Sequence, residues 1–192
     1  MDKLLFVTGN ENKIREIKAI MGNSINMLGL SDVNWTEEIP ETMSTIEGNA
    51  VQKAETVYQK LKIDCFAEDT GLEVNALNGE PGIHSARYAG MERSDDANMN
   101  LLLKKMEKIE DRSAHFKTVI ALIHKGKVHT FEGIAKGHIA SDRMGNEGFG
   151  YDPIFIPEEY SLSFAQLQPQ VKNQISHRAK AVALLVDFLK TI

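Results

Sequence analysis

The sequence predicts an α/β fold, because short apolar runs alternate with segments of helical periodicity. Residues 3–7 form a continuous apolar run that ends at a turn signal, as expected of a buried strand. Ile14, Ile17 and Ile20 then recur at helical spacing. From Ala114 onward the apolar period changes to two, which indicates antiparallel strands. This mixture of strands and helices is typical of the α/β class.

The composition is that of an ordinary soluble globular protein, with 42% hydrophobic and 26% charged residues among 192. This length suits one large domain or two small lobes. The net charge of −5 argues against binding along a nucleic acid backbone. Cys65 is the single cysteine, which excludes an internal disulfide and fits a reducing compartment. No apolar run is long enough to cross a membrane. We therefore expect a cytoplasmic enzyme or binding protein.

The stretch around two adjacent carboxylates, Glu68 and Asp69, is the centre of the sequence. Residues 65–67 are predicted to form a short strand that ends at these carboxylates. Thr70 and Gly71 are predicted to turn the chain before a second extended run. Acidic residues beyond the end of a strand are placed to bind a metal or to transfer a proton. The alternative is a solvated turn with a left-handed glycine.

The first turn of the chain has the form of a strand, a glycine turn and a helix. Residues 8–13 make this turn, and Lys13 falls in the first helical turn. A helix N-terminus offers free N–H groups and a partial positive charge, which suit a phosphate. The segment is not a P-loop. Residues 25–30 are predicted to form the next strand.

A second helix is predicted after an acidic loop at residues 37–42. Ser44 and Glu47 have the spacing of a capping box, with Ser44 at the N-cap. Asn49 and Lys53 share one face of this helix, one turn apart. For Lys53 alone, we expect a solvated surface lysine.

The middle of the chain combines an irregular loop, a helix and a hairpin. Glycine and proline at residues 78–90 predict a loop, and Ser94 is predicted to cap the helix that follows. Residues 116–123 and 128–134 are predicted strands, joined by a turn at 125–127. Histidines in this region lack metal-ligand spacing, so we predict no zinc site.

A second glycine-rich loop covers residues 145–153. Phe149 lies between glycines, where it suits a stacking platform for a flat ligand; alternatively it packs into the core. Residues 153–157 are a predicted strand, and 158–174 are a polar segment. His177 and Arg178 then begin the last helix, where cations oppose the helix dipole.

These features together favour a ligand that carries phosphates and a ring. The carboxylates come without histidine or cysteine ligands, and hard oxygen ligands suit Mg²⁺. Isolated lysines, Mg²⁺ and an aromatic side chain that can stack suit a nucleoside triphosphate.

Five segments also carry a resemblance to a known family. They are residues 8–13, 67–72, 79–88, 149–153 and 176–178, and they occur in the family's order. The sequence closely resembles the inosine triphosphate pyrophosphatase family, the non-canonical purine nucleoside triphosphate pyrophosphatases that are also called Ham1-like proteins. The resemblance extends from the first predicted strand to the last predicted helix.

The resemblance implies an elongated mixed β-sheet with flanking helices and two lobes around a central nucleotide cleft, all within one domain over residues 1–192. It implies a homodimer and the hydrolysis of ITP, dITP or XTP to the monophosphate and pyrophosphate, with Mg²⁺ as the cofactor. Nucleic acid and membranes are not expected partners.

The family pattern also implies roles for individual residues. Asp69 matches the general base and is also a metal ligand, together with Glu41 and Glu68. Glu38 is an alternative to Glu41, which lies closer to the helix start. Glu68 stands where many relatives carry aspartate. The residues that would bind the substrate are Thr8, Gly9, Asn10, Glu11, Asn12, Lys13, Lys53, Thr70, Phe149, Gly150, Tyr151, Asp152, Lys172, His177 and Arg178.

Two other interpretations remain open at this point. In the first, the protein is a phosphatase in which Asp69 is the nucleophile and forms an aspartyl-phosphate. The commonest fold with this chemistry uses a D-x-D pattern, which is missing here because Thr70 and Gly71 follow Asp69. A non-catalytic sensor of purine nucleotides would keep Phe149 and the lysines without needing Glu41, Glu68 and Asp69 together.

Overall fold

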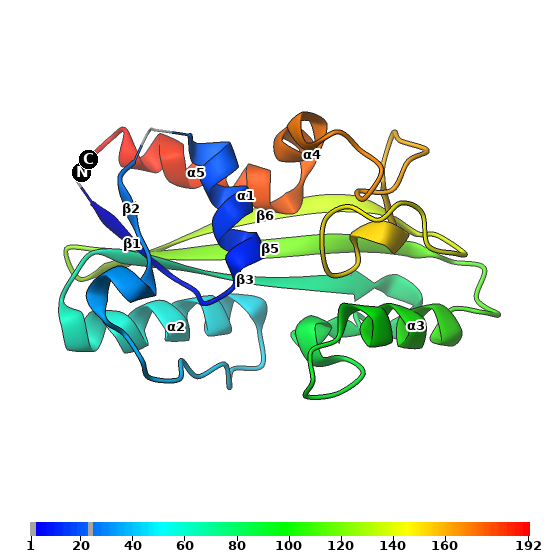
Figure 1. Cartoon of the computed structure of the whole chain (residues 1–192), viewed down its shortest axis with the longest axis horizontal. Helices are drawn as coiled ribbons and strands as arrows, with labels where there is room; N and C mark the ends of the chain where they lie inside the picture. The colour runs from blue at the N-terminus through cyan, green and yellow to red at the C-terminus, as the bar shows by residue number, and fades with distance from the viewer. Residues whose placement is uncertain (1–2, 23–24) are drawn as a thin grey trace. The chain divides into compact units, whose positions relative to one another are not determined.

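The computed structural model describes residues 3–22 and 25–192 and contains one mixed β-sheet (Figure 1). The strands are β1 (Leu4–Val7), β2 (Met27–Leu28), β3 (Cys65–Val74), β4 (Pro81–Gly82), β5 (Ser113–His124), β6 (Lys127–Ile139) and β7 (Phe155–Pro157). The helices are α1 (Glu11–Met21), α2 (Ile46–Leu61), α3 (Asp95–Lys105), α4 (Pro169–Ile175) and α5 (His177–Leu189). The strand order is β2-β1-β3-β5-β6-β7, with β4 beside β3. Since β1 is parallel to β2 and β3, whereas β4 and β7 are antiparallel to their neighbours, the predicted mixed α/β class is confirmed.

The chain divides into two compact units. Unit 1 comprises Met1–Asp69, Thr118–Gly133 and His177–Ile192, and unit 2 comprises Thr70–Lys117 and Ile134–Ser176. The strands β3, β5 and β6 each contribute residues to both units. The single domain and the cleft that the resemblance implies stay predictions.

Unit 1 has its own hydrophobic core, in which Phe6 of β1 stacks on Phe66 of β3 with ring centroids 4.5 Å apart. The amphipathic helices α1 and α5 pack beside each other, and α2 covers the other side of the strands (Figure 1). This placement follows from right-handed crossovers, because the chain leaves β1 for β2 in one direction and returns past β1 to β3 in the other.

Unit 2 has a separate core around three aromatic rings. Phe116 packs edge-on against Phe155 at 4.7 Å, and Phe164 lies 5.1 Å from Phe155. The apolar side of α3 joins this core through Met99 and Leu102. Among residues 3–22 and 25–192, no helix combines the length and the apolar character that a membrane crossing requires.

The central stretch differs from its prediction, because β3 does not turn at Thr70 and Gly71. It continues as one strand of 10 residues, in which Glu68 and Asp69 occupy the middle. The ladder explains this continuity: Ala67 pairs with Val7 before the carboxylates, and Leu72 pairs with Gly82 after them. The carboxylates are therefore held by a rigid strand instead of a loop.

Two boundaries in the first half of the chain also differ from prediction. The N-cap of α2 is Thr45 and not Ser44, because the Thr45 hydroxyl accepts the N–H of Gly48. The strand predicted over residues 25–30 is limited to β2, and a 3₁₀ turn at Leu30–Val33 follows it.

In the second half, the polar segment 158–174 contains a helix that was not predicted, α4. Three local predictions are confirmed: Ser94 caps α3 by accepting the N–H of Ala97, residues 125 and 126 form the hairpin turn, and α5 begins at His177. The strand predicted at residues 153–157 is confirmed for Phe155–Pro157 only.

Gly133 in β6 lets α5 approach the sheet within unit 1. A Cβ atom at Gly133 would lie 2.0 Å from the carbonyl oxygen of His177 and 2.5 Å from the nitrogen of Ala181. Both of these atoms belong to the backbone of α5, so neither moves aside without shifting the helix. Glycine at this position therefore helps to place the first turn of α5.

We expect Gly133→Ala to lower the free energy of unfolding by about 3 kcal/mol, at the upper end of the usual cost of overpacking. Urea unfolding followed by circular dichroism measures this change. Gly29→Ala is the matched control, because the added methyl would meet nothing closer than 3.7 Å. Equal stabilities of the two variants would contradict the prediction, because they would show that α5 shifts to accommodate the methyl group at little cost.

Candidate active site

The turn at residues 8–13 is ordered by its own side chains. The Thr8 hydroxyl accepts the N–H of Asn10 at 3.1 Å. Asn10 is the N-cap of α1, and its side-chain oxygen accepts the N–H groups of Asn12 at 3.0 Å and Lys13 at 3.1 Å. The cap therefore fixes the start of α1, and Lys13 lies in the first turn of this helix, as the sequence predicts.

Lys53 joins two of the predicted acidic residues within unit 1. Its ammonium donates to Glu41 Oε1 at 2.7 Å and to Asp69 Oδ1 at 2.9 Å. Burial alone would lower the pKa of Lys53, but the negative charges of Asp69 and then Glu41 outweigh it and raise that pKa. Lys53 is only 6% exposed, so the expectation of a solvated lysine is wrong.

Asn49 lies one helical turn before Lys53 and touches the other oxygen of Asp69. Its side-chain oxygen accepts the N–H of Met43 at 2.9 Å, so its amide NH₂ faces Asp69 Oδ2 at 3.4 Å. Gln52 exchanges two hydrogen bonds with Thr42, at 2.9 and 2.8 Å. Each of residues 41–43 is thus held by a side chain of α2.

Glu68 is bound by three donors in the buried interior of unit 1. Arg178 donates Nε and Nη2 to the two carboxylate oxygens, each at 2.8 Å, and Lys13 Nζ lies 3.1 Å from Oε1. Arg178 also donates to Glu16 on α1. Arg178 and Glu68 are each 1% exposed, so this fork-to-fork pair is shielded from water.

The ion pairs of this network keep its members charged. Burial alone would raise the pKa of Glu68, but Arg178 and Lys13 hold it well below its usual range. Burial lowers the pKa of Arg178, yet Glu68 and Glu16 more than compensate and raise it. At Lys13 burial prevails and lowers the pKa of the ammonium, although Glu68 acts in the opposite direction.

The donor set of Glu41 and Asp69 fits Mg²⁺. Both carboxylates face the same point, where the Lys53 ammonium now lies, and both are hard oxygen ligands. Magnesium is commonly held by one or two carboxylates together with phosphate oxygens of the substrate. Glu68 fits less well because Arg178 engages both of its oxygens, and Glu38 is exposed. In the described part of the chain no three acidic, histidine or cysteine side chains form a metal cluster.

In unit 2, Asp152 organises the second glycine-rich loop. Its Oδ2 accepts the N–H of Phe149 at 2.9 Å and the Lys172 ammonium at 2.6 Å. Gly148 adopts a φ of 81°, and a Cβ there would lie 2.1 Å from Asp152 Oδ2. Only glycine therefore permits this approach of the carboxylate to the loop backbone.

Phe149 keeps part of its surface accessible, and the Lys172 ammonium lies 5.6 Å from its ring centroid. Tyr151 is buried and donates its hydroxyl to the carbonyl oxygen of Ser85 at 2.8 Å. Gly150, between them, adopts a φ of 61°. The loop thus combines a half-exposed aromatic ring with a buried carboxylate and a buried ammonium.

The predicted residues therefore gather in two groups, and each group is described within its own unit. Unit 1 holds the contacts of Lys13, Lys53, Glu41, Glu68, Asp69 and Arg178. Thr8 to Asn10 form the adjoining turn, Glu11 and Asn12 begin α1, and His177 is buried beside Arg178 in α5. Unit 2 holds Phe149 to Asp152 with Lys172, and Thr70 is half-buried in β3.

Two residues of this arrangement were missed as site residues. Asn49 has a sequence signal, since it precedes Lys53 by one turn, and a polar pair on one face of a helix calls for a shared partner. Glu16 has no such signal, because its partner Arg178 lies 162 residues further along the chain.

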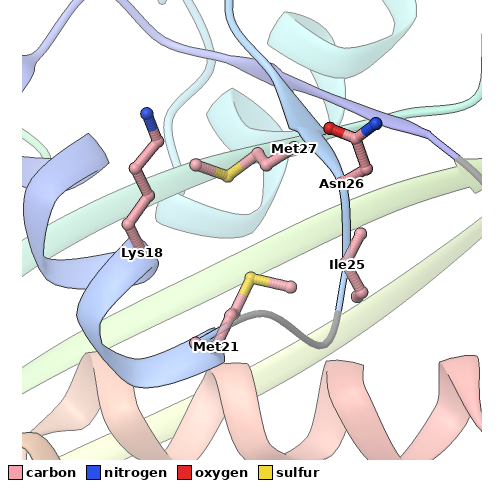
Figure 2. Close-up of a pocket in the computed structure, with 6 residues that line it drawn as sticks. Lys18, Met21, Ile25, Asn26 and Met27 are labelled. Carbon is pink, nitrogen blue, oxygen red and sulfur yellow. The ribbon is translucent and has the colours of Figure 1, made fainter.

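A pocket elsewhere in unit 1 contains none of the predicted site residues. Figure 2 shows it at the end of α1 and along β2. It is lined by Lys18, Met21, Gly22, Ile25, Asn26 and Met27. These residues flank residues 23 and 24, which lie outside the described ranges, so we assign no role to this pocket.

These features define an α/β protein in which each unit carries its own candidate binding groups. Lysines beside paired carboxylates suit a phosphate with its counter-ion, and the loop around Phe149 suits a planar group.

Comparison with known proteins identifies the family. A sequence model of the Ham1 family matches residues 4–188. The chain is 56% identical to the dITP/XTP pyrophosphatase of Flavobacterium johnsoniae over 187 residues, which cover 97% of both proteins. It is 54% identical to the dITP/XTP pyrophosphatase of Flavobacterium psychrophilum, covering 98% of this chain and 99% of that protein. The solved structure of the Staphylococcus aureus Ham1 protein superimposes with a TM-score of 0.91 at 41% identity over 99% of both chains. The chain belongs to the Ham1 family.

We expect Glu68→Gln to lower the free energy of unfolding by about 3 kcal/mol at neutral pH, because a buried arginine loses its charged partner. The folded pKa of Glu68 lies below the ordinary value of 4.5, so its stabilising effect is fully present above pH 4.5. As the pH falls below that value, the unfolded chain takes up the proton first, and the difference between wild type and variant shrinks.

Urea unfolding at a series of pH values between neutral and acid measures both effects. Glu37→Gln is the control, since Glu37 pairs with Lys60 at the surface, where such pairs contribute about 0–1 kcal/mol. A difference between wild type and Glu68→Gln that does not change with pH would contradict the prediction.

Proposed function

We propose that this protein hydrolyses the non-canonical purine nucleoside triphosphates ITP, dITP and XTP to the monophosphate and pyrophosphate. Relatives that match over nearly their whole length are dITP/XTP pyrophosphatases. The observation that supports the chemistry best is the buried contact of Lys53 with both Glu41 and Asp69. It brings one ammonium together with two carboxylates, and an ammonium can stabilise the charge that develops on a leaving pyrophosphate.

The reaction proposed for unit 1 is attack of water on the α-phosphorus. The new bond forms between the water oxygen and phosphorus, the bond to the bridging oxygen of the β-phosphate breaks, and pyrophosphate leaves. Asp69 accepts the proton of the water, because Lys53 and Asn49 hold its two oxygens in a fixed orientation. Lys13 and Lys53 stabilise the charge that develops on the leaving group.

We propose Mg²⁺ as the cofactor, with Glu41 and Asp69 as its protein ligands. When bound, Mg²⁺ neutralises phosphate charge. Glu68 has a different role in this proposal: it fixes Arg178 and Lys13 from inside unit 1.

We propose that unit 2 recognises the base. Phe149 stacks on the purine, and Asp152 accepts the N1–H of a 6-keto purine. The Lys172 ammonium beside Asp152 is a donor for the 6-keto oxygen. Adenine carries an amino group at this position, so ATP would set a donor against a donor.

We also propose a homodimer in the cytoplasm. The homodimer rests on the resemblance to the family, and light scattering tests it by the mass in solution. The cytoplasmic location is supported by the cysteine content, since Cys65 is the single cysteine and an internal disulfide is excluded, which fits a reducing compartment. Fractionation of cells that produce the protein tests the location.

We expect Asp69→Asn to reduce pyrophosphate release from dITP and XTP by at least about 100-fold, because the general base is lost. Incubation of ITP, dITP, XTP, GTP and ATP, with Mg²⁺ or with a chelator, tests this when pyrophosphate and orthophosphate are separated. Wild type should release pyrophosphate from ITP, dITP and XTP, and only with Mg²⁺.

Asp187→Asn is the control, because Asp187 pairs with Lys190 at the surface. Orthophosphate as the product would make Asp69 a nucleophile, and retention of nucleotide without any product would indicate a sensor.

We expect Asp152→Ala to reduce the preference for dITP over ATP, measured as the ratio of kcat/KM values, by about tenfold or more. Asp111→Ala is the control, since Asp111 is exposed and accepts hydrogen bonds from its close neighbour Ser113. Melting temperatures separate a loss of recognition from a loss of fold, because Asp152 is buried. An unchanged preference in a folded variant would exclude Asp152 from base recognition.

A further inference from the structure

The first two turns of α3 hold both ends of the loop at residues 143–150 within unit 2. Arg143 donates to Asp96 Oδ1 at 2.5 Å and to Asn100 Oδ1 at 3.0 Å. At the other end, the N–H of Gly150 donates to Asp95 Oδ2 at 2.7 Å. None of these α3 residues belongs to the site that the sequence predicts, yet they bind the loop that carries Phe149.

The bond from Asp95 to Gly150 is not needed to cap α3. Ser94 already performs this function, since its hydroxyl accepts the N–H of Ala97 at 3.2 Å. An aspartate in the first turn of a helix has a favourable interaction with the helix dipole without contacting anything else. Here the carboxylate instead contacts a backbone N–H 55 residues further along the chain.

This bond acts on the backbone on one side of Phe149. A peptide group is planar, so a hydrogen bond that holds its N–H restricts the orientation of the whole group. Asp152 binds the N–H of Phe149, and Asp95 binds the N–H of Gly150. The two peptide groups that flank the Cα of Phe149 are therefore each held by a different carboxylate, and together they set the direction of the Cα–Cβ bond from which the ring projects.

Gly150 has a conformation that makes the second of these bonds important. With a φ of 61° it lies in the left-handed region, where glycine also has other conformations of similar energy. No atom packs against Gly150 on the side where a Cβ would stand, since such a Cβ would meet nothing within 4 Å. Local sterics therefore allow the Gly150 backbone several conformations, and the hydrogen bond that its N–H donates to Asp95 selects one of them.

We propose that Asp95 is a positioning residue for base recognition, which orients Phe149 through the N–H of Gly150. This inference rests on the proposed function of unit 2 in binding the purine. Asp95 itself does not contact the base in this role. It determines specificity by keeping the ring in the orientation on which a flat base stacks.

The test compares Asp95→Ala with Asp95→Asn in the full chain. Alanine removes the acceptor, whereas asparagine keeps a side-chain oxygen for the N–H of Gly150. The matched control is Asp32→Ala, because Asp32 Oδ2 accepts the N–H of Gly29 at the same 2.7 Å, in unit 1. Steady-state kinetics with dITP and with ATP give kcat and KM for each variant.

For Asp95→Ala we expect the KM for dITP to rise about tenfold and the preference for dITP over ATP to fall by about the same factor, as for the loss of one charge-assisted hydrogen bond. The kcat should change less, because the residues proposed to act on the phosphates belong to unit 1. Asp95→Asn should recover most of the preference, and Asp32→Ala should match wild type. An unchanged preference in Asp95→Ala, or equal defects in Asp95→Ala and Asp95→Asn, would overturn the proposal.

Hydrogen exchange without nucleotide tests the placement of the loop independently of any activity. The N–H of Gly150 should exchange at least about tenfold faster in Asp95→Ala than in wild type, whereas the core strands should exchange at equal rates. Equal exchange at Gly150 would overturn the proposal. If wild type does not hydrolyse dITP at all, the proposed function fails, and the exchange result still reports whether Asp95 holds the loop.

Discussion

The buried ion pair of Arg178 with Glu68 is the constraint on which unit 1 depends. Each side chain would be costly to bury alone, so the strand that carries Glu68 and the helix that carries Arg178 must meet. Glu16 and Lys13 add a second carboxylate and a second cation from α1. One strand and two helices are thereby fixed by charges, and this requires the exact approach that Gly133 permits at the start of α5.

Contacts with neighbouring elements also make Asp69, the proposed general base, rigid. Asp69 follows Glu68 in a continuous strand, so its position is fixed by the ladder on either side. Asn49 and Lys53 then fix its two oxygens from α2. Preorganised charges of this kind need no reorganisation during reaction, which is the main source of electrostatic catalysis. The loop of unit 2 is held in a comparable way, because the carboxylates of Asp152 and Asp95 accept its backbone N–H groups.

The sequence predicts the family, the α/β class and most local features, and the structure confirms those that act over a few residues. Ser94 caps its helix and residues 125 and 126 form a turn, because capping and turn geometry involve neighbouring residues only. Where two local signals compete, the prediction is less exact. Ser44 and Thr45 are both residue types that suit an N-cap. In the structure the Thr45 hydroxyl accepts the N–H of Gly48, so Thr45 is the N-cap. Thr70 and Gly71 resemble a turn, but pairing on both sides of them extends β3.

By itself the sequence determined the residue types of the site and their order, since chemistry and short-range periodicity are written along the chain. The tertiary structure alone decided which of these residues are partners. Arg178 meets Glu68 across 110 residues of sequence, and Lys53 is buried although its helix position suits the surface. Such pairs depend on the desolvation of charges when distant segments pack together, and this energy has no counterpart in any local pattern.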